Sequence, residues 1–417
     1  MIEAIRNAFK VPDLRKKILF TLLMLIVYRF GAHIPVPGVK IGAIEKLFSS
    51  KDAGVLGFID LFTGGALSRF AIFALGIMPY ITSSIIMQLL TVVIPTLEQW
   101  QKEGEVGQRK ITQVTRYLTL VLAIVEASGY TLLFQSQLQT AFSPLDKYLI
   151  VITLTAGTAL IMWLGELITQ RGIGNGMSLL IFASIISRMP QAVYDTFRVI
   201  NPAVAIAFFG LLGAIMVSII VMEKGQRRIP VQYAKRVVGR KMYSGGSTYI
   251  PLKINSAGVI PIIFASSVLL FPATIGKFLP GRFTSLVSAL APGSVYRMVF
   301  EAVLIVFFAY FYTAIVFNPI EISDNIKKYG GFVPGVRPGR PTAIHLDKVL
   351  NRITLPGSLF LAAIAILPDI FGVRLGIPFF AQNFGGTSLL IVVGVALETM
   401  MQLESQLLQR HYEGFLK

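Results

Sequence analysis

Long runs of apolar residues alternate with short polar segments along the whole chain. Most runs approach the roughly 20 residues that an α-helix needs to cross the hydrocarbon core of a bilayer. The fifth and ninth runs are shorter, which a bundle tolerates when neighbouring helices shield them. The pattern predicts ten membrane-spanning helices, at residues 18–34, 73–94, 115–135, 148–168, 177–193, 203–222, 256–275, 299–318, 353–368 and 386–403.

The composition supports a membrane protein and excludes several kinds of chemistry. Of the 417 residues, 54% are hydrophobic and 14% are charged, which an ordinary soluble domain does not show. The chain has no cysteine, so disulfides, iron–sulfur clusters and thiol chemistry are excluded. Its 3 histidines lie far apart, and no Walker A, HExxH or GxSxG motif is present. We therefore expect no catalytic residue, no metal site and no cofactor.

The basic residues predict how the chain is oriented. The formal net charge is +17, and most lysines and arginines fall in the segments that share a membrane side with the N-terminus. Positive charge accumulates on the cytoplasmic side of membrane proteins. Both termini are therefore predicted to be cytoplasmic.

Two of the segments predicted to be cytoplasmic are long and basic, at residues 223–253 and 323–352. The first has strand-like runs around a Gly-Gly turn, Gly245 and Gly246, which predicts a projecting hairpin. The second is rich in glycine, proline and arginine. Both segments could simply set the membrane topology. Their basic density also suits binding to an anionic or acidic partner.

Two short matches indicate an internal repeat of five spans plus five spans. Many membrane folds consist of two inverted halves, in which span two corresponds to span seven and span five to span ten. Spans two and seven share a glycine three residues before a proline and an isoleucine two residues after it. Spans five and ten begin with G-M-S-L-L-I and G-T-S-L-L-I. The repeat pairs Ile81 with Ile263 and Ile181 with Ile391.

The matched isoleucines suit a pore seal, because branched aliphatic side chains close a pore by excluding water. Core packing is the plain alternative, since it explains most isoleucines in any helix bundle. A secondary transporter with inverted repeats is a further alternative, but it needs polar groups near the bilayer midplane. Glu126 is the acidic residue near the middle of a span. It either serves such a site or pairs structurally with a neighbouring polar side chain.

Several long motifs over nearly the whole chain resemble the SecY family, the channel subunits of the bacterial Sec translocase. They are GGALSRFAIFALGIMPYI, WLGELITQRGIGNGMSLLIF, VIPIIFASS, FYTAIVFNP, FVPGVRPG and FGGTSLLIVV. The resemblance implies an all-α membrane protein, an hourglass of ten helices in two inverted five-helix halves. The halves would be residues 1–195 and 196–417. It also implies a passive, gated pore, and not an enzyme, that moves unfolded secretory polypeptides across the membrane and releases transmembrane helices laterally into it.

The resemblance assigns roles to individual residues. A hydrophobic pore ring would consist of Ile77, Ile81, Met177, Ile181, Ile263 and Ile391, with Met177 at a position where relatives often carry a branched side chain. A short half-helix, the plug, would cover about 61–71 and include Leu61, Phe62, Gly64, Gly65, Leu67 and Arg69. The lateral gate would lie between spans two and three and spans seven and eight, with polar residues at Thr82, Glu126 and Asn255.

The resemblance also implies partners and a location. The two basic segments would dock the SecA ATPase and the ribosome through Arg227, Arg228, Arg240, Lys241 and Arg337. SecE and SecG would be membrane subunits, and signal peptides and nascent polypeptides would pass through the pore or leave it into the lipid bilayer. The location would be the inner (plasma) membrane.

Overall fold

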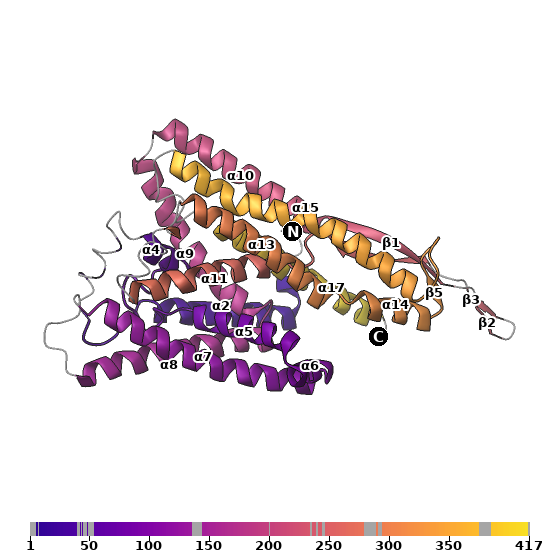
Figure 1. The fold of residues 1–417 in the computed structure, drawn as a ribbon, viewed down its shortest axis with the longest axis horizontal. Helices are drawn as coiled ribbons and strands as arrows, with labels where there is room; N and C mark the ends of the chain where they lie inside the picture. The colour runs from indigo at the N-terminus through magenta and orange to yellow at the C-terminus, as the bar shows by residue number, and fades with distance from the viewer. Residues whose placement is uncertain are drawn as a thin grey trace.

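The computed structural model is a bundle of long helices with a strand hairpin at one end (Figure 1). It describes residues 6, 8–39, 42, 44, 48, 54–135, 144–199, 201–233, 236–238, 241–243, 247–278, 289–290, 294–374 and 385–415. The helices are α2 (Pro12–Gly31), α4 (Gly54–Phe62), α5 (Met78–Val93), α6 (Pro95–Lys102), α7 (Glu105–Leu133), α8 (Pro144–Arg171), α9 (Gly176–Val199), α10 (Pro202–Lys224), α11 (Ile260–Phe278), α13 (Val295–Val316), α14 (Pro319–Lys328), α15 (Arg340–Arg374) and α17 (Gly386–Phe415).

The helices of the two sequence halves pack in the same order. In the first half α5 packs on α7, α7 on α8 and α8 on α9, while in the second α11 packs on α13, α13 on α15 and α15 on α17. The purple helices of the first half lie below the orange and yellow helices of the second in Figure 1. Contacts of α5 and α7 with α11, and of α9 with α17, join the halves. Helix α9 runs from Gly176 to Val199 and so continues past residue 195, the last residue of the predicted first half.

Among the described residues, seven helices are long and apolar enough to cross a membrane, or eight if α5 and α6 form one span bent by 100°. The predicted spans at 18–34 and 256–275 correspond to α2 and α11, which are outside this set. Several helices continue past their apolar stretch: α7 begins at Glu105 and α17 ends at Phe415. The apolar pattern marks only the part of a helix that contacts lipid or core, so it underestimated these lengths.

The starts of α5 and α11 correct two predicted boundaries. The sequence placed the second span from residue 73 and the seventh from residue 256, but the helices begin at Met78 and Ile260. Gly76 and Gly258 have φ values of 58° and 62°, a left-handed conformation that a helix cannot include. Pro79 and Pro261 then occupy the first turn of each helix, where a missing N–H costs nothing. The repeat seen in the sequence is therefore also a repeat of backbone conformation.

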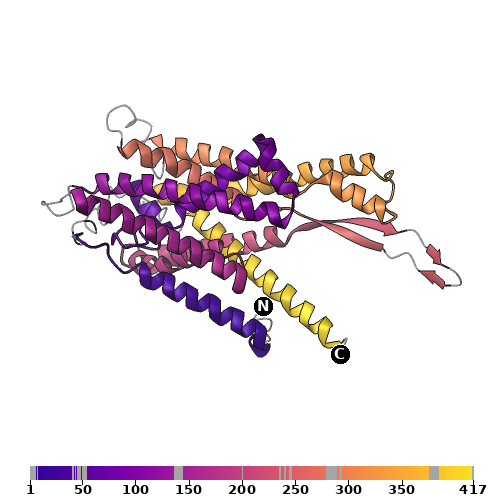
Figure 2. The same ribbon diagram turned by 90° about the horizontal axis from the view of Figure 1, so that it is seen from below.

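The predicted hairpin over 223–253 is confirmed. Strand β1 (Gln226–Tyr233) pairs antiparallel with β4 (Ser247–Lys253), and β2 (Arg236–Val238) pairs with β3 (Lys241–Tyr243). The hairpin projects from the bundle in Figure 2, and both ends of the chain lie toward the same side. We call this side the hairpin end. Gly245 and Gly246, the residues predicted to form the turn, lie outside the described residues; the innermost described pair of the hairpin is Val238 with Lys241.

The second basic segment, 323–352, is mostly ordered into elements and not an open loop. It contains the end of α14, the strand β5 (Gly331–Phe332) and the start of α15. Strand β5 pairs with β1, which gives a three-stranded sheet of order β4-β1-β5. An apolar core that includes Ile229, Val231, Leu252, Ile326 and Leu346 lies between the sheet and the helices α14 and α15. The two basic segments therefore form one folded unit at the hairpin end.

Candidate functional site: a ring of isoleucines between a polar cavity and a buried segment

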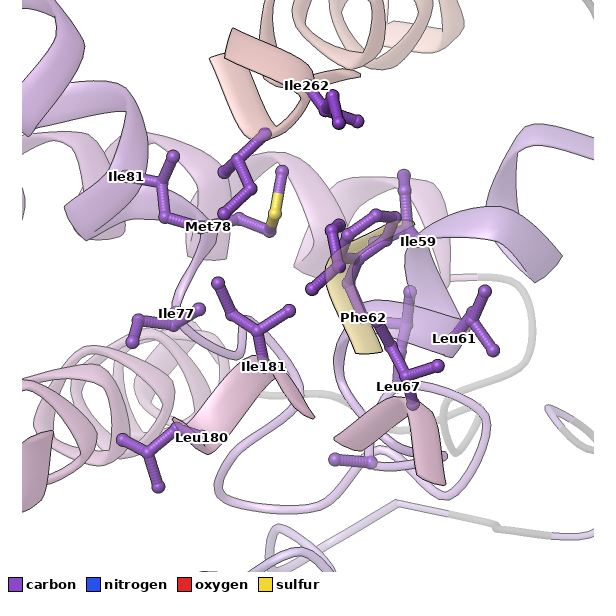
Figure 3. Close-up of a cluster of buried hydrophobic side chains, with 14 of the residues drawn as sticks. Ile59, Leu61, Phe62, Leu67, Ile77, Met78, Ile81, Leu180, Ile181 and Ile262 are labelled. Carbon is purple, nitrogen blue, oxygen red and sulfur yellow. The ribbon is translucent and has the colours of Figure 1, made fainter. Parts of the chain in front are cut away.

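Four of the six predicted ring residues, Ile81, Met177, Ile181 and Ile263, line one cavity, and all six belong to or pack against one apolar cluster. Ile77 immediately precedes α5 and Ile81 lies on it, Met177 and Ile181 lie on α9, Ile263 on α11 and Ile391 on α17. The five isoleucines are buried, and Met177 packs against the same apolar cluster. Figure 3 shows Ile181 with Ile77 and Ile81 on one side and Phe62 and Leu67 on the other. Residues from both halves thus meet in one apolar layer.

Two glycines allow the helices that carry Ile181 and Ile391 to begin close to their neighbours. Gly176 starts α9 against the backbone carbonyl of Gly165, and Gly386 starts α17 against the carbonyl of Ile364. A Cβ atom at either position would overlap that oxygen. The same close approach therefore occurs in both halves, at the positions that the sequence repeat pairs.

A cavity of about 410 Å³ borders this layer and extends along α5 from Ile81 to Gln88, toward α6. Helix α6 lies toward the hairpin end in Figure 1. Ile81, Met177, Ile181 and Ile263 form part of its apolar lining, and its polar lining comes from Gln88, Arg116, Glu166, Thr169, Gln170 and Asn175. The guanidinium of Arg116 donates to both carboxylate oxygens of Glu166, at 2.7 and 2.6 Å. The lining of the cavity thus changes from charged and polar side chains to mostly aliphatic side chains at the ring.

The other side of these ring residues is filled by residues 54–76, which we call the α4–turn segment. Helix α4 packs against α9 and α11, and the turns that follow it reach α5. Leu61, Phe62, Gly64, Gly65 and Leu67 are buried, and Arg69 is half-buried. The ring therefore has solvent-accessible polar space on one side and a dry, filled space on the other.

The predicted half-helix over 61–71 is wrong in its position. The helix is Gly54–Phe62, and residues 63–70 form turns. Gly64 and Gly65 have φ values of 65° and 88°, which end the helix. Phe70 also has a positive φ, 45°. The sequence prediction placed the half-helix directly before the second span, whereas a series of turns separates α4 from α5.

The three predicted gate residues lie on or beside three different helices, α5, α7 and α11. Thr82 donates within its own helix to the carbonyl of Met78 at 3.1 Å. Asn255 lies ahead of α11 and donates to the Glu223 carboxylate at 2.7 Å and to the Gly258 carbonyl at 2.9 Å. Glu126 is half-buried on α7. No hydrogen bond joins Thr82, Glu126 and Asn255 in the part of the chain that the structure describes. Their helices nevertheless meet, since α5 and α7 pack on α11.

The predicted docking residues lie on the folded unit at the hairpin end. Arg227 and Arg228 are exposed on β1, and the Arg228 guanidinium stacks over the Tyr249 ring at 4.8 Å. Arg337 is exposed in the turn between β5 and α15. Lys241 belongs to β3, and Arg240 lies outside the described residues. The sheet therefore connects the first segment to the second through β1 and β5.

Sequence reasoning missed the polar partners on both sides of the ring. Arg116 and Glu166 lie 50 residues apart in the chain, and Asp60 of α4 forms an ion pair with Arg188 of α9 over 128 residues. Charged residues inside or beside apolar runs were the available signal. Pairing them needs the packing of helices, which the sequence pattern does not provide.

Comparison with known proteins decides the family. A model of the SecY family matches residues 71–400. The chain belongs to the SecY family. It is 51% identical to the protein translocase subunit SecY of Streptomyces scabiei, and the similarity covers 100% of both chains. The resemblance seen in the sequence motifs is thereby confirmed.

Solved structures of the family share the fold. One structural match has a TM-score of 0.65 and 17% identity and covers 96% of both chains. It is described as "The plug domain of the SecY protein stablizes the closed state of the translocation channel and maintains a membrane seal". Sec61 in the canine ribosome-channel complex from the endoplasmic reticulum has a TM-score of 0.61 and 18% identity, again over 96% of both chains.

Proposed function

We propose that this protein is the central pore subunit of a protein translocation channel. It is a passive, gated pore that moves unfolded secretory polypeptides across the membrane and releases transmembrane helices sideways into the bilayer. The observation that carries the proposal is the isoleucine ring, built by both halves between a polar cavity and a buried segment. A narrow apolar constriction excludes water and ions without any chemistry of its own.

The membrane part of the proposal is a bundle of ten spans in two inverted halves, 1–195 and 196–417. The matched starts of α5 and α11, the matched starts of α9 and α17, and the parallel packing order of the halves support it. The two spans beyond the eight apolar ones are α2 and α11. Both termini and the hairpin end are placed in the cytoplasm of a cell with this protein in its inner membrane, because basic residues are concentrated there.

The α4–turn segment is the plug in this proposal, and the contact of α5 and α7 with α11 is the lateral gate. Separation of α11 from α5 and α7 opens a path from the pore to lipid for signal peptides and membrane helices. Thr82, Glu126 and Asn255 lie on or beside these helices and would adjust how readily they separate.

Arg227, Arg228, Arg240, Lys241 and Arg337 are proposed to dock the SecA ATPase and the ribosome, with SecE and SecG as membrane subunits. Exposed arginines on a rigid sheet suit polyanionic ribosomal RNA and acidic protein surfaces. Such binding weakens as the salt concentration rises.

The alternative of a secondary transporter is less well supported. It needs a polar substrate site near the middle of the membrane. The described cavity ends on isoleucines, and Glu126 does not line it.

Site-specific crosslinking tests the proposed function. The native chain has no cysteine, so Ile81→Cys and Ile263→Cys each introduce a single thiol into the ring. We expect both to crosslink to a stalled secretory polypeptide. Val121→Cys, an exposed position on the outer face of α7, is the control and should not react. Crosslinks at the control but at neither ring position contradict the proposal.

A further inference from the structure

Asp60 and Arg188 form an ion pair between the α4–turn segment and α9. Asp60 is 3% exposed, and its carboxylate accepts from Nη2 of Arg188. The same carboxylate accepts from the backbone N–H of Ser68 at 2.8 Å. Nη2 of Arg188 also donates to Oγ of Ser68 at 3.1 Å. One ion pair thus connects the end of α4, the following turns and a helix of the pore.

A second arginine holds the same turns from the other side. Nη1 of Arg29, on α2, donates to the carbonyl of Gly64 at 2.8 Å. The hydroxyl of Tyr28 lies 2.5 Å from that of Ser184, which fastens α2 to α9. The turns at Gly64 and Gly65 are therefore bound by side chains of two helices, α2 and α9.

The glycine pair makes room for both guanidinium groups. A Cβ atom on Gly64 would lie 2.9 Å from Nη1 of Arg29, and one on Gly65 would lie 2.7 Å from Nη2 of Arg188. Both glycines also adopt positive φ values, which side chains disfavour. The Gly-Gly sequence is needed because two cations approach the backbone at this point.

We propose that Asp60 and Arg188 are positioning residues that latch the α4–turn segment against the closed pore. The inference rests on the proposed function, since it assumes that this segment seals the ring. Helix α9 carries Met177 and Ile181 of the ring together with Arg188 of the latch. A movement of α9 relative to α4 breaks the ion pair and leaves a buried carboxylate without its partner. Breaking such a pair is strongly unfavourable, so the latch favours the closed arrangement.

Positive side chains outnumber negative ones around the latch, which predicts that loss of Asp60 and loss of Arg188 have effects of different size on the seal. Arg29 is close enough to Arg69 and to Arg188 for their charges to interact, and Asp60 pairs with Arg188. Loss of Asp60 removes a negative charge that compensates the positive charges of these arginines. Loss of Arg188 removes one of these cations, and Asp60 keeps its bond from the Ser68 N–H. Removal of Asp60 should therefore open the seal more than removal of Arg188.

The test is the resting ion conductance of the complete translocation complex in planar bilayers, without substrate. We expect Asp60→Asn to raise it roughly tenfold or more, Arg188→Met to raise it less, and Arg188→Lys to preserve most of the seal. The double variant Asp60→Asn with Arg188→Met should leak no more than Asp60→Asn alone, because both changes remove one interaction. Arg198→Met is the matched control on α9, where Arg198 stacks on Tyr194 at 4.7 Å, and it should leave the conductance unchanged.

A reversible crosslink separates displacement of the segment from general damage. Ser184 Cβ lies 3.3 Å from a Cβ built on Gly64, near the spacing of a disulfide. In the Asp60→Asn background, Gly64→Cys with Ser184→Cys should be tight when oxidised and leaky after reduction. The same cysteine pair with Asp60 retained is the control for the strain of a side chain at Gly64, and it should be tight when oxidised. A leak that persists in the oxidised complex overturns the latch. If Asp60→Asn fails to accumulate in the membrane, Arg188→Met replaces it in the crosslink test, because the Arg188 side chain is 32% exposed.

The outcomes distinguish the latch from the proposed function. If serine at the ring isoleucines causes a leak while Asp60→Asn and Arg188→Met stay as tight as the native complex, the latch is wrong and the pore assignment stands. If the ring variant also stays tight, the pore assignment itself fails.

Discussion

The two sides of the isoleucine ring differ in what fills them. On the hairpin-end side a cavity of about 410 Å³ is lined by polar groups and by the Arg116–Glu166 pair. On the other side the buried α4–turn segment packs against α9 and α11, and it is bound by Arg188 at the Asp60 carboxylate and by Arg29 at the Gly64 carbonyl. In the proposed channel, the polar side receives the polypeptide, and the α4–turn segment has to move before the polypeptide can pass. The barrier therefore depends on the ring and on the segment behind it.

Gly65→Ala, in the α4–turn segment, is expected to increase the ion leak and lower the stability more than the other three substitutions below. Gly65→Ala places a Cβ atom beside the Arg188 guanidinium and forces a φ of 88° on alanine. Left-handed strain of about 1–2 kcal/mol adds to overpacking of about 1–3 kcal/mol. We expect lower thermal stability and a clear ion leak, measured by melting of the purified complex and by bilayer conductance.

The control for Gly65→Ala is Gly213→Ala on α10, where a Cβ atom meets nothing within 4 Å. Alanine favours a helix over glycine by roughly 0.5–1 kcal/mol, so this control should be neutral or slightly stabilising. Equal effects at the two glycines would contradict the special role of the turn.

A smaller effect on the same side is expected for Arg29→Met. The change removes a charge-assisted bond to the Gly64 carbonyl, worth about 1.5–3 kcal/mol. The resting conductance should rise, but less than for Gly65→Ala, because the ion pair of Asp60 with Arg188 remains. A leak greater than that of Gly65→Ala would show that α2, and not α9, is the main anchor.

On the cavity side, Glu166→Gln should change stability by about 1 kcal/mol or less, because the Arg116 side chain is 42% exposed. The resting conductance should not change, since Glu166 takes no part in the seal. A matched control is Glu105→Gln, which breaks an exposed pair with Arg109. A leak in Glu166→Gln would mean that the polar cavity also contributes to the barrier.

The smallest effect on both leak and stability is expected for Arg337→Glu, at the hairpin end. The side chain is exposed, and the backbone carbonyl of Arg337 accepts a hydrogen bond from the Thr342 hydroxyl at 2.8 Å. We expect export driven by the ATPase partner to fall sharply while melting and resting conductance stay native. Arg198→Glu, an equally exposed change on α9, is the control for charge reversal alone. Unchanged export in Arg337→Glu would refute the docking role.

The sequence pointed to isoleucines that the structure buries in the apolar core, but not to the charged pairs near them, for a physical reason. Ile81, Ile181, Ile263 and Ile391 could be found because an internal repeat leaves matched residues at matched positions. The strand hairpin could also be found, because its pattern is local. The pairs of Asp60 with Arg188 and of Arg116 with Glu166 could not, since each joins helices whose packing is set by the whole bundle.

The errors in boundaries have a common cause. Glycines at positive φ end or delay helices at residues 64, 65, 76 and 258, and nothing in an apolar pattern reveals φ. The pairing of β5 with β1 was missed because β5 has only two residues, Gly331 and Phe332. Such a short strand gains its order from its partner and not from its own sequence.

The measurement that tests the central claim most directly is the resting ion conductance of the complete complex with serine at Ile81, Ile181, Ile263 and Ile391. These side chains form the apolar layer between cavity and segment, and water enters a polar constriction that it cannot enter when the lining is aliphatic. A permanently leaky membrane is the predicted result, with the single serine variants intermediate. A complex that folds, reaches the membrane and remains as tight to small ions as the native one would contradict the account.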